Sequence, residues 1–324
     1  MGERAEPGSV RGLLIVDKPA GPTSHGVVAR IRRLAGTRKV GHAGTLDPMA
    51  TGLLIVGLGP ATRLLTFLVG LGKVYRATLR LGWETVTDDA EGQACGPPAD
   101  AARLAGLSDD EIRAALRAFV GTIRQVPSSV SAVKVAGRRA YDVVRAGGVV
   151  ELPARTVTIE RLDVETIRRP AGAGGAAPAV DVTLEVACSS GTYIRALARD
   201  AGRALGVGGH LTALRRSVVG PFGLGEAVGL TRLEADGVAP HLVCPAAAAA
   251  RLFPTRLLDA SQARDLGHGK RLSAAAVAGG GDADAAGRFA AIAPDGRLVG
   301  IAEARDGVVR SLVNIAPGIE GAQQ

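Results

Sequence analysis

Cysteine is scarce in this chain of 324 residues, which has only Cys95, Cys188 and Cys244, far apart and odd in number. No CxxC pair and no Cys/His spacing of the zinc-binding type occurs, so neither a disulfide framework nor a zinc site is predicted. The HExxH and Walker A motifs are absent too. Glycine pairs at 57–59 and 70–72 lack the third glycine of a dinucleotide-binding loop, and we interpret them as turns. The sequence therefore predicts no bound metal and no cofactor.

Long apolar runs are also missing. The run at residues 12–16 soon meets a charge, and no stretch of about 18 uncharged apolar residues, the length that a membrane span needs, is present. We therefore expect a soluble protein in the cytoplasm, with no membrane association.

Lysine is rare: five of the 39 basic residues are lysine, which leaves 34 arginines. The formal net charge of +8 favours a polyanionic partner such as nucleic acid. A GC-rich genome would also enrich arginine together with alanine and glycine, so the total charge alone does not decide. Clustering of the charge would favour nucleic acid.

Hydrophobic periodicity predicts an α+β fold, in which a mixed, mainly antiparallel sheet is flanked by helices. Strict alternation of apolar and polar residues predicts strands at 73–82 and 180–188. Apolar residues at helical spacing, with caps at their starts, predict helices at 24–34, 109–119 and 194–205.

The alanine run Pro245–Ala250 is interpreted as a boundary between a domain of residues 1–250 and a domain of residues 251–324. Beyond the run, Asp295-Gly296 lies between two apolar stretches and predicts a β-hairpin. A further strand is predicted at 308–315. The last part of the chain is therefore expected to form a small β domain. The Gly/Ala/Pro segment 171–178 is expected to be a mobile loop, and the Gly/Ala-rich segment 278–287 is expected to be disordered.

The string Gly-His-Ala-Gly-Thr-Leu-Asp-Pro-Met-Ala-Thr at residues 41–51 holds one acidic residue, Asp47, and is followed at once by an apolar strand. A buried strand can hold such a carboxylate in one place, as an enzyme with a single catalytic carboxylate requires. Local chemistry alone favours a simpler interpretation, because Asp followed by Pro is typical of a type I turn.

This string resembles the active-site motif of the bacterial tRNA pseudouridine-55 synthase family (TruB) and departs from it only at Ala43, where the family usually has a small hydroxyl residue. Four other blocks resemble family motifs and follow in family order. They are Leu-Ile-Val-Asp-Lys-Pro at 14–19 with its continuation to 25, Lys-Val-Tyr-Arg at 73–76, the block at 125–134, and Cys-Ser-Ser-Gly-Thr-Tyr-Ile-Arg at 188–195. The resemblance implies the pseudouridine synthase fold, with a PUA-like RNA-binding domain at the C-terminal end.

The resemblance implies that Asp47 is the catalytic group, acting either as a nucleophile or as a base on the sugar. It implies Arg195 as the counter-charge of Asp47. Arg195, Arg199 and Arg203 are spaced four residues apart, which is otherwise typical of a solvated helix face. We therefore expect an active-site role for Arg195 only.

By the same resemblance, Tyr75 stacks on the target uracil, and Tyr193 and Leu214 help to line its pocket. A lone tyrosine on the apolar side of a strand is more often a core residue. His42, by resemblance, fills the space that the uridine leaves in the RNA. The alternative is a loop histidine that is hydrogen-bonded to backbone.

Residues 124–155 form the family's insertion and contain six basic residues against two acidic ones. This density fits an arm that contacts RNA phosphates, with Lys134, Arg138, Arg139 and Arg145 as candidates. The expected function is isomerisation of uridine 55 in the T-loop of tRNA to pseudouridine, by a monomer that needs no obligatory protein partner. The alternatives are a non-catalytic RNA-binding or RNA-folding protein, and a related synthase with another RNA target.

Overall fold

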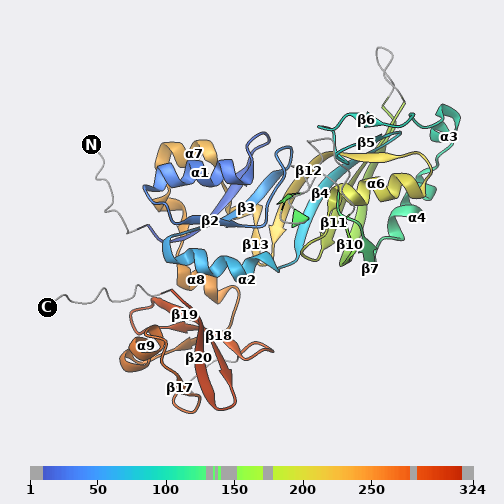
Figure 1. Ribbon diagram of the computed structural model, residues 1–324. Coiled ribbons are helices and arrows are strands. Elements are labelled where there is room, and N and C mark those ends of the chain that lie inside the picture. The colour runs from blue at the N-terminus through green and yellow to red at the C-terminus, as the bar shows by residue number, and fades with distance from the viewer. Residues whose placement is uncertain are drawn as a thin grey trace. The chain divides into compact units, whose positions relative to one another are not determined.

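The computed structural model describes residues 10–128, 152–170, 178–277 and 283–315, together with the backbone of 134–135 and 138–139 (Figure 1). The chain divides into two compact units. The first comprises Met1–Pro48, Gly52–Val69 and Pro221–Gln324, and the second comprises Met49–Thr51 and Gly70–Gly220. Segments that are distant in the sequence thus share a unit.

The first unit contains a sheet around two strands whose residues 13–16 and 53–56 are apolar and buried. β1 (Gly12–Lys18) pairs antiparallel with β3 (Thr51–Leu58), and β3 pairs antiparallel with β2 (Val40–Ala43). The short strands β14 (Val228–Gly229) and β15 (Leu242–Val243) pair with β1, the first in parallel and the second antiparallel. A strand that is buried on both faces needs such continuous apolar sequence.

Helices cover both faces of β1 and β3 (Figure 1). On one face, α1 (Ser24–Ala35) and α7 (Leu230–Asp236) share a core with these strands. On the other side lie α2 (Leu65–Val69), which follows the 3-10 turn Gly59–Leu64, and α8 (Pro245–Ala250). Thr23 caps α1 by accepting a hydrogen bond from the Gly26 N–H, so the predicted helix start is confirmed.

The alanine run is itself α8, a helix whose Ala248 and Ala249 are fully buried. Its residues contact β1 and also two strands of the C-terminal sheet, β18 (Arg288–Ile292) and β19 (Leu298–Arg305). The alanine side chains are small, which lets the helix approach both sheets closely. The domain boundary at 250 stays a prediction.

The C-terminal sheet has the strand order β16-β18-β19-β20-β17, with β16 (Thr255–Leu257) parallel to β18 and the other pairs antiparallel. β17 is Leu272–Ser273, and β20 is Val308–Asn314. Helix α9 (Ala260–Gly267) packs on β19 and β20. Gly296 has a φ of 79° in the turn between β18 and β19, so the hairpin and the small β domain that the sequence predicted are both confirmed.

The second unit is built on an antiparallel sheet with the order β12-β4-β11-β10-β7. Its strands are β4 (Lys73–Leu81), β7 (Gly121–Gln125), β10 (Arg155–Arg168), β11 (Val180–Cys188) and β12 (Gly209–Val219). Both strands that alternation predicted, β4 and β11, are present and adjacent. In both strands every second residue is buried, which confirms the predicted alternation.

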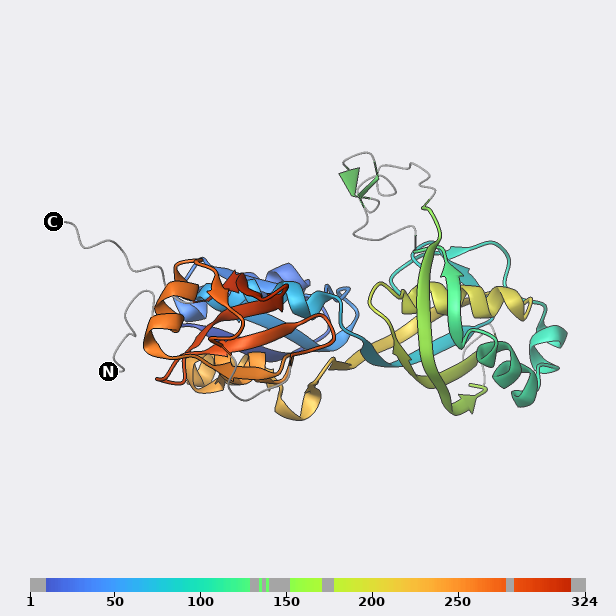
Figure 2. The same ribbon diagram turned by 90° about the horizontal axis from the view of Figure 1, so that it is seen from below.

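Helix α6 (Ile194–Ala204) lies against one face of this sheet and contacts β4 and β12 (Figures 1 and 2). Gly202 allows the close approach, because a Cβ there would lie 2.2 Å from the Gly208 carbonyl carbon. The sheet is accompanied by α3 (Ala101–Ala105), α4 (Asp109–Arg117) and the hairpin of β5 (Glu84–Thr85) and β6 (Ala94–Cys95). The mixed, mainly antiparallel sheets with flanking helices confirm the predicted α+β class.

Candidate active site

Asp47 lies in the loop that joins β2 to β3 in the first unit, and both of its chain neighbours are fixed by the segment that leads into α1. The buried Ser24 hydroxyl donates to the Leu46 carbonyl oxygen at 3.0 Å and accepts from the Leu46 N–H at 2.8 Å. On the other side of Asp47, the Pro48 carbonyl oxygen accepts from the Gly21 N–H at 2.9 Å. Two sequence motifs, 14–25 and 41–51, thus combine to hold one short loop.

Lys18 adds a charged anchor to this loop. Its side chain is fully buried, and its ammonium group donates to the carbonyl oxygens of Pro19 at 3.0 Å and Pro48 at 3.1 Å. Burying an ammonium group is costly unless hydrogen-bond acceptors surround it. The carbonyl of the residue after Asp47 is one of these acceptors, so Lys18 and the loop stabilise each other.

His42 lies on β2, just before the loop, and is half-buried. Its ring meets the ring of the exposed His25, from the start of α1, edge to face at a centroid distance of 5.3 Å. The two imidazoles therefore form a pair beside the Asp47 loop. The role of His42 in filling the space left by a uridine stays a prediction.

Tyr75 and Leu214 lie on adjacent strands of the second unit and share a face of the sheet. Leu214 is the cross-strand partner of Ala77, which is two residues from Tyr75 on β4. The exposed fractions are only 7% for Tyr75 and 8% for Leu214. The Leu214 carbonyl oxygen also accepts from the Thr51 hydroxyl at 3.4 Å. The structure therefore brings together two of the three residues expected to line a base pocket.

Tyr193, the third, precedes α6 as its N-cap residue. Its backbone is held from both sides by the Gln125 side chain. The Gln125 amide nitrogen donates to the Tyr193 carbonyl oxygen at 3.1 Å, and the Gln125 amide oxygen accepts from the Tyr193 N–H at 2.8 Å. Gln125 thus fixes the entry of the chain into α6, at the point where the motif Thr-Tyr-Ile-Arg begins.

Arg195 is buried in the first turn of α6, with 5% of its area exposed. Its guanidinium donates to the Thr87 carbonyl oxygen at 2.9 Å and forms an ion pair with Asp89 at 3.2 Å. Asp89 also accepts from the Thr87 hydroxyl at 2.5 Å and from the Glu91 N–H at 3.1 Å. Asp89 is a partner of Arg195 that the sequence analysis missed, and the pairing of Arg195 with Asp47 stays a prediction.

The interpretation of Arg199 as part of a solvated helix face is wrong. The Arg199 side chain is 9% exposed and pairs with Asp88 at 3.0 Å, whereas the Arg203 side chain is 58% exposed and pairs with Glu84. Burial raises the pKa of Asp88, an effect that the Arg199 guanidinium opposes. The adjacent acids Asp88 and Asp89, a few residues beyond the predicted strand 73–82, were the clue in the sequence.

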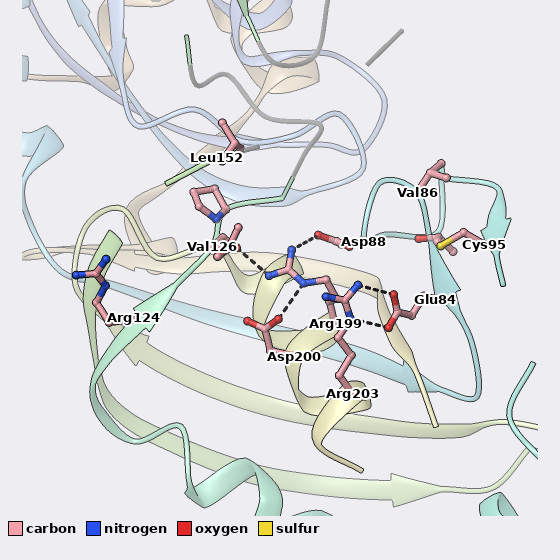
Figure 3. A pocket seen from close by; sticks show the side chains of 12 residues that line it. Glu84, Val86, Asp88, Cys95, Arg124, Val126, Leu152, Arg199, Asp200 and Arg203 are labelled. Carbon is pink, nitrogen blue, oxygen red and sulfur yellow. Dashed lines mark hydrogen bonds and ion pairs between the residues drawn. The ribbon is translucent and has the colours of Figure 1, made fainter. Parts of the chain in front are cut away.

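These ion pairs border a hollow of about 540 Å³ in the second unit (Figure 3). Three arginines and three carboxylates line it: Arg124, Arg199 and Arg203, with Glu84, Asp88 and Asp200. The charges balance, so this hollow offers no net attraction for a phosphate.

The two ends of the insertion are held together at its root, because Gln125 on β7 is the register partner of Arg155 on β10. Within it, the short strands β8 (Lys134–Val135) and β9 (Arg138–Arg139) pair antiparallel. Arg145 lies outside the described residues, as do the segments 171–177 and 278–282. The phosphate contacts expected of Lys134, Arg138, Arg139 and Arg145 stay predictions.

In the part of the chain that the structure describes, no cluster of three His, Cys, Asp or Glu side chains is placed to hold a metal ion. None of the described helices is both long and apolar enough to cross a membrane.

Three family models match the chain. The N-terminal domain model of the TruB family pseudouridylate synthases matches residues 32–194. The model of the tRNA pseudouridylate synthase B C-terminal domain matches 195–239, and that of the C-terminal part of tRNA pseudouridine synthase II matches 253–316.

Curated relatives agree with these matches. The tRNA pseudouridine synthase B of Arthrobacter sp. (strain FB24) is 54% identical over 95% of this chain and 98% of its own length. The protein of the same name from Thermobifida fusca (strain YX) is 53% identical over 94% and 98%.

Solved structures agree as well. A chain of an H/ACA RNP bound to a substrate RNA containing 2′-deoxyuridine is 25% identical with a TM-score of 0.68, covering 94% of this chain and 85% of that one. A chain of a Cbf5-Nop10-Gar1 complex is 28% identical with a TM-score of 0.65, covering 90% and 78%. The chain belongs to the TruB family of pseudouridylate synthases, and it is an enzyme of that family.

Proposed function

We propose that this chain converts uridine 55 in the T-loop of tRNA to pseudouridine, with Asp47 as the catalytic residue. The observation that carries the proposal is the similarity, along nearly their whole length, to relatives named tRNA pseudouridine synthase B. The firmly anchored loop around Asp47 supports it, because a carboxylate that acts at one atom of the substrate must be held in one place.

The proposed reaction rearranges bonds without any change in oxidation state. The bond from C1′ of the ribose to N1 of uracil breaks, the base rotates, and a bond from C1′ to C5 forms. The hydrogen on C5 is then lost, and N1 gains one. Asp47 acts at the ribose, either by attacking C1′ or by removing a proton from the sugar. The reaction itself requires no redox cofactor and no ATP.

The target uridine must leave the base stack before Asp47 can reach its sugar, at a cost of a few kcal/mol. We propose that Tyr75 stacks on the extruded uracil, because any base offers a π face. Tyr193 and Leu214 complete the pocket, and His42 fills the space left in the RNA. The shared, buried face of Tyr75 and Leu214 supports this arrangement.

Arg195 is proposed to provide the positive charge next to Asp47. The insertion is proposed to bind phosphates of the T-arm through Lys134, Arg138, Arg139 and Arg145, and residues 251–324 are proposed as an accessory RNA-binding domain. We propose that the enzyme acts in the cytoplasm as a monomer, without an obligatory protein partner and without a cofactor or metal.

A second candidate function is the modification of another RNA within a guide complex, because two structural neighbours were solved in complexes that are named H/ACA. The relatives named for tRNA are about twice as similar, at 54% against 28% identity. This difference favours the first candidate.

The test is incubation of the purified chain with an unmodified tRNA transcript, followed by mapping of pseudouridine along the RNA. We expect modification at position 55 alone, in the absence of any added protein or guide RNA. A transcript with cytidine at position 55 serves as the control and should stay unmodified. Binding without product, or product at other positions only, would contradict the proposal.

A further inference from the structure

Three arginines of α6 form a row, and each meets a carboxylate from the segment 84–89. Arg203 forms two hydrogen bonds to Glu84 at 2.7 and 2.8 Å. One turn earlier, Arg199 pairs with Asp88, and one turn earlier again, Arg195 pairs with Asp89. The spacing of four residues places all three guanidinium groups on one face of the helix. The row therefore connects three successive turns of α6 to one segment, residues 84–89.

Burial separates the inner pairs from the outer one. The exposed fractions of the arginine side chains are 58% for Arg203, 9% for Arg199 and 6% for Arg195. An exposed ion pair contributes little to stability, whereas removal of one partner from a buried pair leaves an uncompensated charge. Arg203 is thus a natural control for Arg199, because the chemistry is the same and the burial differs.

Arg199 contacts three separate segments, as Figure 3 shows. Its guanidinium donates to Asp88 in the loop at 3.0 Å, to Asp200 on its own helix at 2.8 Å, and to the Val126 carbonyl oxygen at 2.8 Å. Val126 is the residue that follows β7, where the insertion begins. A single side chain therefore links α6, the Asp88 loop and the root of the insertion.

The residue before Val126 reinforces this link. Gln125 holds the backbone of Tyr193 at the N-cap of α6 through two hydrogen bonds. Two consecutive residues at the root of the insertion are therefore tied to α6, one at the helix start through Tyr193 and one in its second turn through Arg199. The root of the insertion and the helix that carries Arg195 are therefore joined by hydrogen bonds at two places.

Asp88 has a backbone conformation that the surroundings must hold in place. Its φ is 59°, in the left-handed region, although its side chain is buried. Such a conformation costs free energy and persists where several contacts determine it. Its N–H donates to the Thr85 carbonyl oxygen, its carbonyl oxygen accepts from the Leu211 N–H, and its carboxylate pairs with Arg199. The next residue, Asp89, is the one that holds Arg195.

From these contacts we propose that Arg199, acting with Asp88, is a positioning residue that couples the insertion to the active-site arginine. Through Asp88 it fixes the loop whose next residue orients Arg195, and through Val126 it fixes the root of the arm that binds RNA. The inference rests on the proposed function, because it assumes that Arg195 serves the reaction and that the insertion binds the substrate.

The test compares Arg199→Met, Arg199→Lys and Asp88→Asn with wild type and with the control Arg203→Met. The substrate is an unmodified T-arm stem-loop. The dissociation constant is measured by filter binding. The single-turnover rate is measured at saturating RNA. Circular dichroism and thermal unfolding of each variant show whether it is folded.

For Arg199→Met and Asp88→Asn we expect the saturated rate to fall by at least about tenfold, because small displacements of catalytic groups cost large factors in rate. The dissociation constant should change by less than about threefold, because the phosphate-binding residues of the insertion remain. Arg199→Lys should recover part of the rate, since lysine keeps the charge but cannot reach all three partners. Arg203→Met should stay close to wild type.

A folded Arg199→Met or Asp88→Asn enzyme with a saturated rate within about threefold of wild type would overturn the inference, as would an equal loss in Arg203→Met. If Arg199→Met does not fold, Asp88→Asn and Arg199→Lys decide the question by the same criteria. An inactive wild-type enzyme would instead count against the proposed function, so the two failures can be told apart.

Discussion

The Ser24 hydroxyl is the smallest group on which the Asp47 loop depends. It donates to the Leu46 carbonyl oxygen and accepts from the Leu46 N–H. Ser24, Leu46 and Asp47 all lie in the first unit. Ser24→Ala leaves a buried N–H and a buried carbonyl without this partner, which costs about 1–3 kcal/mol of stability. We expect a lower free energy of unfolding in urea together with a lower saturated rate, because the loop loses an anchor.

Thr23→Ala is the matched control for Ser24→Ala. Thr23 caps the same helix but its hydroxyl contacts the Gly26 N–H and not the loop. Loss of this cap should cost about 1 kcal/mol of stability and leave the saturated rate unchanged. A rate that falls equally in both variants would show that helix stability matters and that the contact of Ser24 with the loop does not.

Lys73 gives the stability of the protein a specific dependence on pH. Burial, together with the nearby Arg216, lowers the pKa of Lys73 from 10.5 to about 8. Between these values the unfolded chain binds more protons than the folded one, so this residue makes stability rise with pH. Below pH 8 both states are protonated, and the contribution is constant.

In wild type, this residue should raise the free energy of unfolding by up to about 1.4 kcal/mol per pH unit between pH 8 and 10. Lys73→Met should remove that rise. Urea unfolding of wild type and variant at several pH values measures the difference. Lys39→Met, which removes an exposed lysine, is the control for the loss of one positive charge. Parallel stability curves for wild type and Lys73→Met would contradict the lowered pKa.

Among the elements, the insertion is predicted to set affinity and to leave the chemistry alone. Replacing Lys134, Arg138 and Arg139 by Ala should remove up to three phosphate contacts. The slope of log affinity against log salt should become shallower by roughly 0.7–0.9 per contact, with little change in the saturated rate.

The control for the insertion variant is a second triple variant, which removes the same total charge elsewhere. It replaces Arg76, Arg103 and Arg161 by Ala. Each of these arginines pairs with a carboxylate in the second unit. This control variant should keep the salt slope of wild type. If the insertion variant keeps its slope and loses its saturated rate, the arm belongs to the catalytic assembly.

The sequence predicted those elements whose signal is local. Alternation placed β4 and β11, capping residues placed the starts of α1 and α4, and Asp295-Gly296 placed the C-terminal hairpin. A period of two, or a cap three residues from its partner, needs no knowledge of the rest of the chain.

The missed contacts join residues that are far apart in the sequence. Arg199 meets an acid 111 positions away, and Arg195 meets one 106 positions away. The spacing of these arginines is the same for a solvated face and for a buried row, so only the fold distinguishes the two. The role of Arg195 beside Asp47 came from family resemblance, not from local chemistry.

At the scale of the whole molecule, Pro221–Gln324 shares a compact unit with the start of the chain. The domain boundary at residue 250 that the sequence suggested stays a prediction. Composition does not indicate that a late segment of the chain packs against an early one. Phe67 and Phe253, which come from the two distant parts of this unit, pack edge to face with their ring centroids 5.1 Å apart.

A protein cut near residue 250 is predicted to keep a complete active site and to bind full-length tRNA more weakly. It should lose little on an isolated T-arm stem-loop. Because Phe67 loses its partner and the buried face of α8 is exposed, its midpoint of thermal unfolding should fall. Both proteins are compared on both RNAs, and a truncated protein that is folded yet inactive on the stem-loop would refute the accessory role.

The most direct test of the central claim is the Asp47→Asn variant, assayed for pseudouridine at position 55 of an unmodified tRNA. Asn keeps the shape of the side chain and loses its charge, so the loop should fold as before. Asp163→Asn, on an exposed residue of β10, is the control and should retain wild-type activity. We predict that Asp47→Asn binds tRNA with wild-type affinity and forms no detectable product. Product formation within about tenfold of the wild-type rate would contradict the assignment of Asp47 as the catalytic residue.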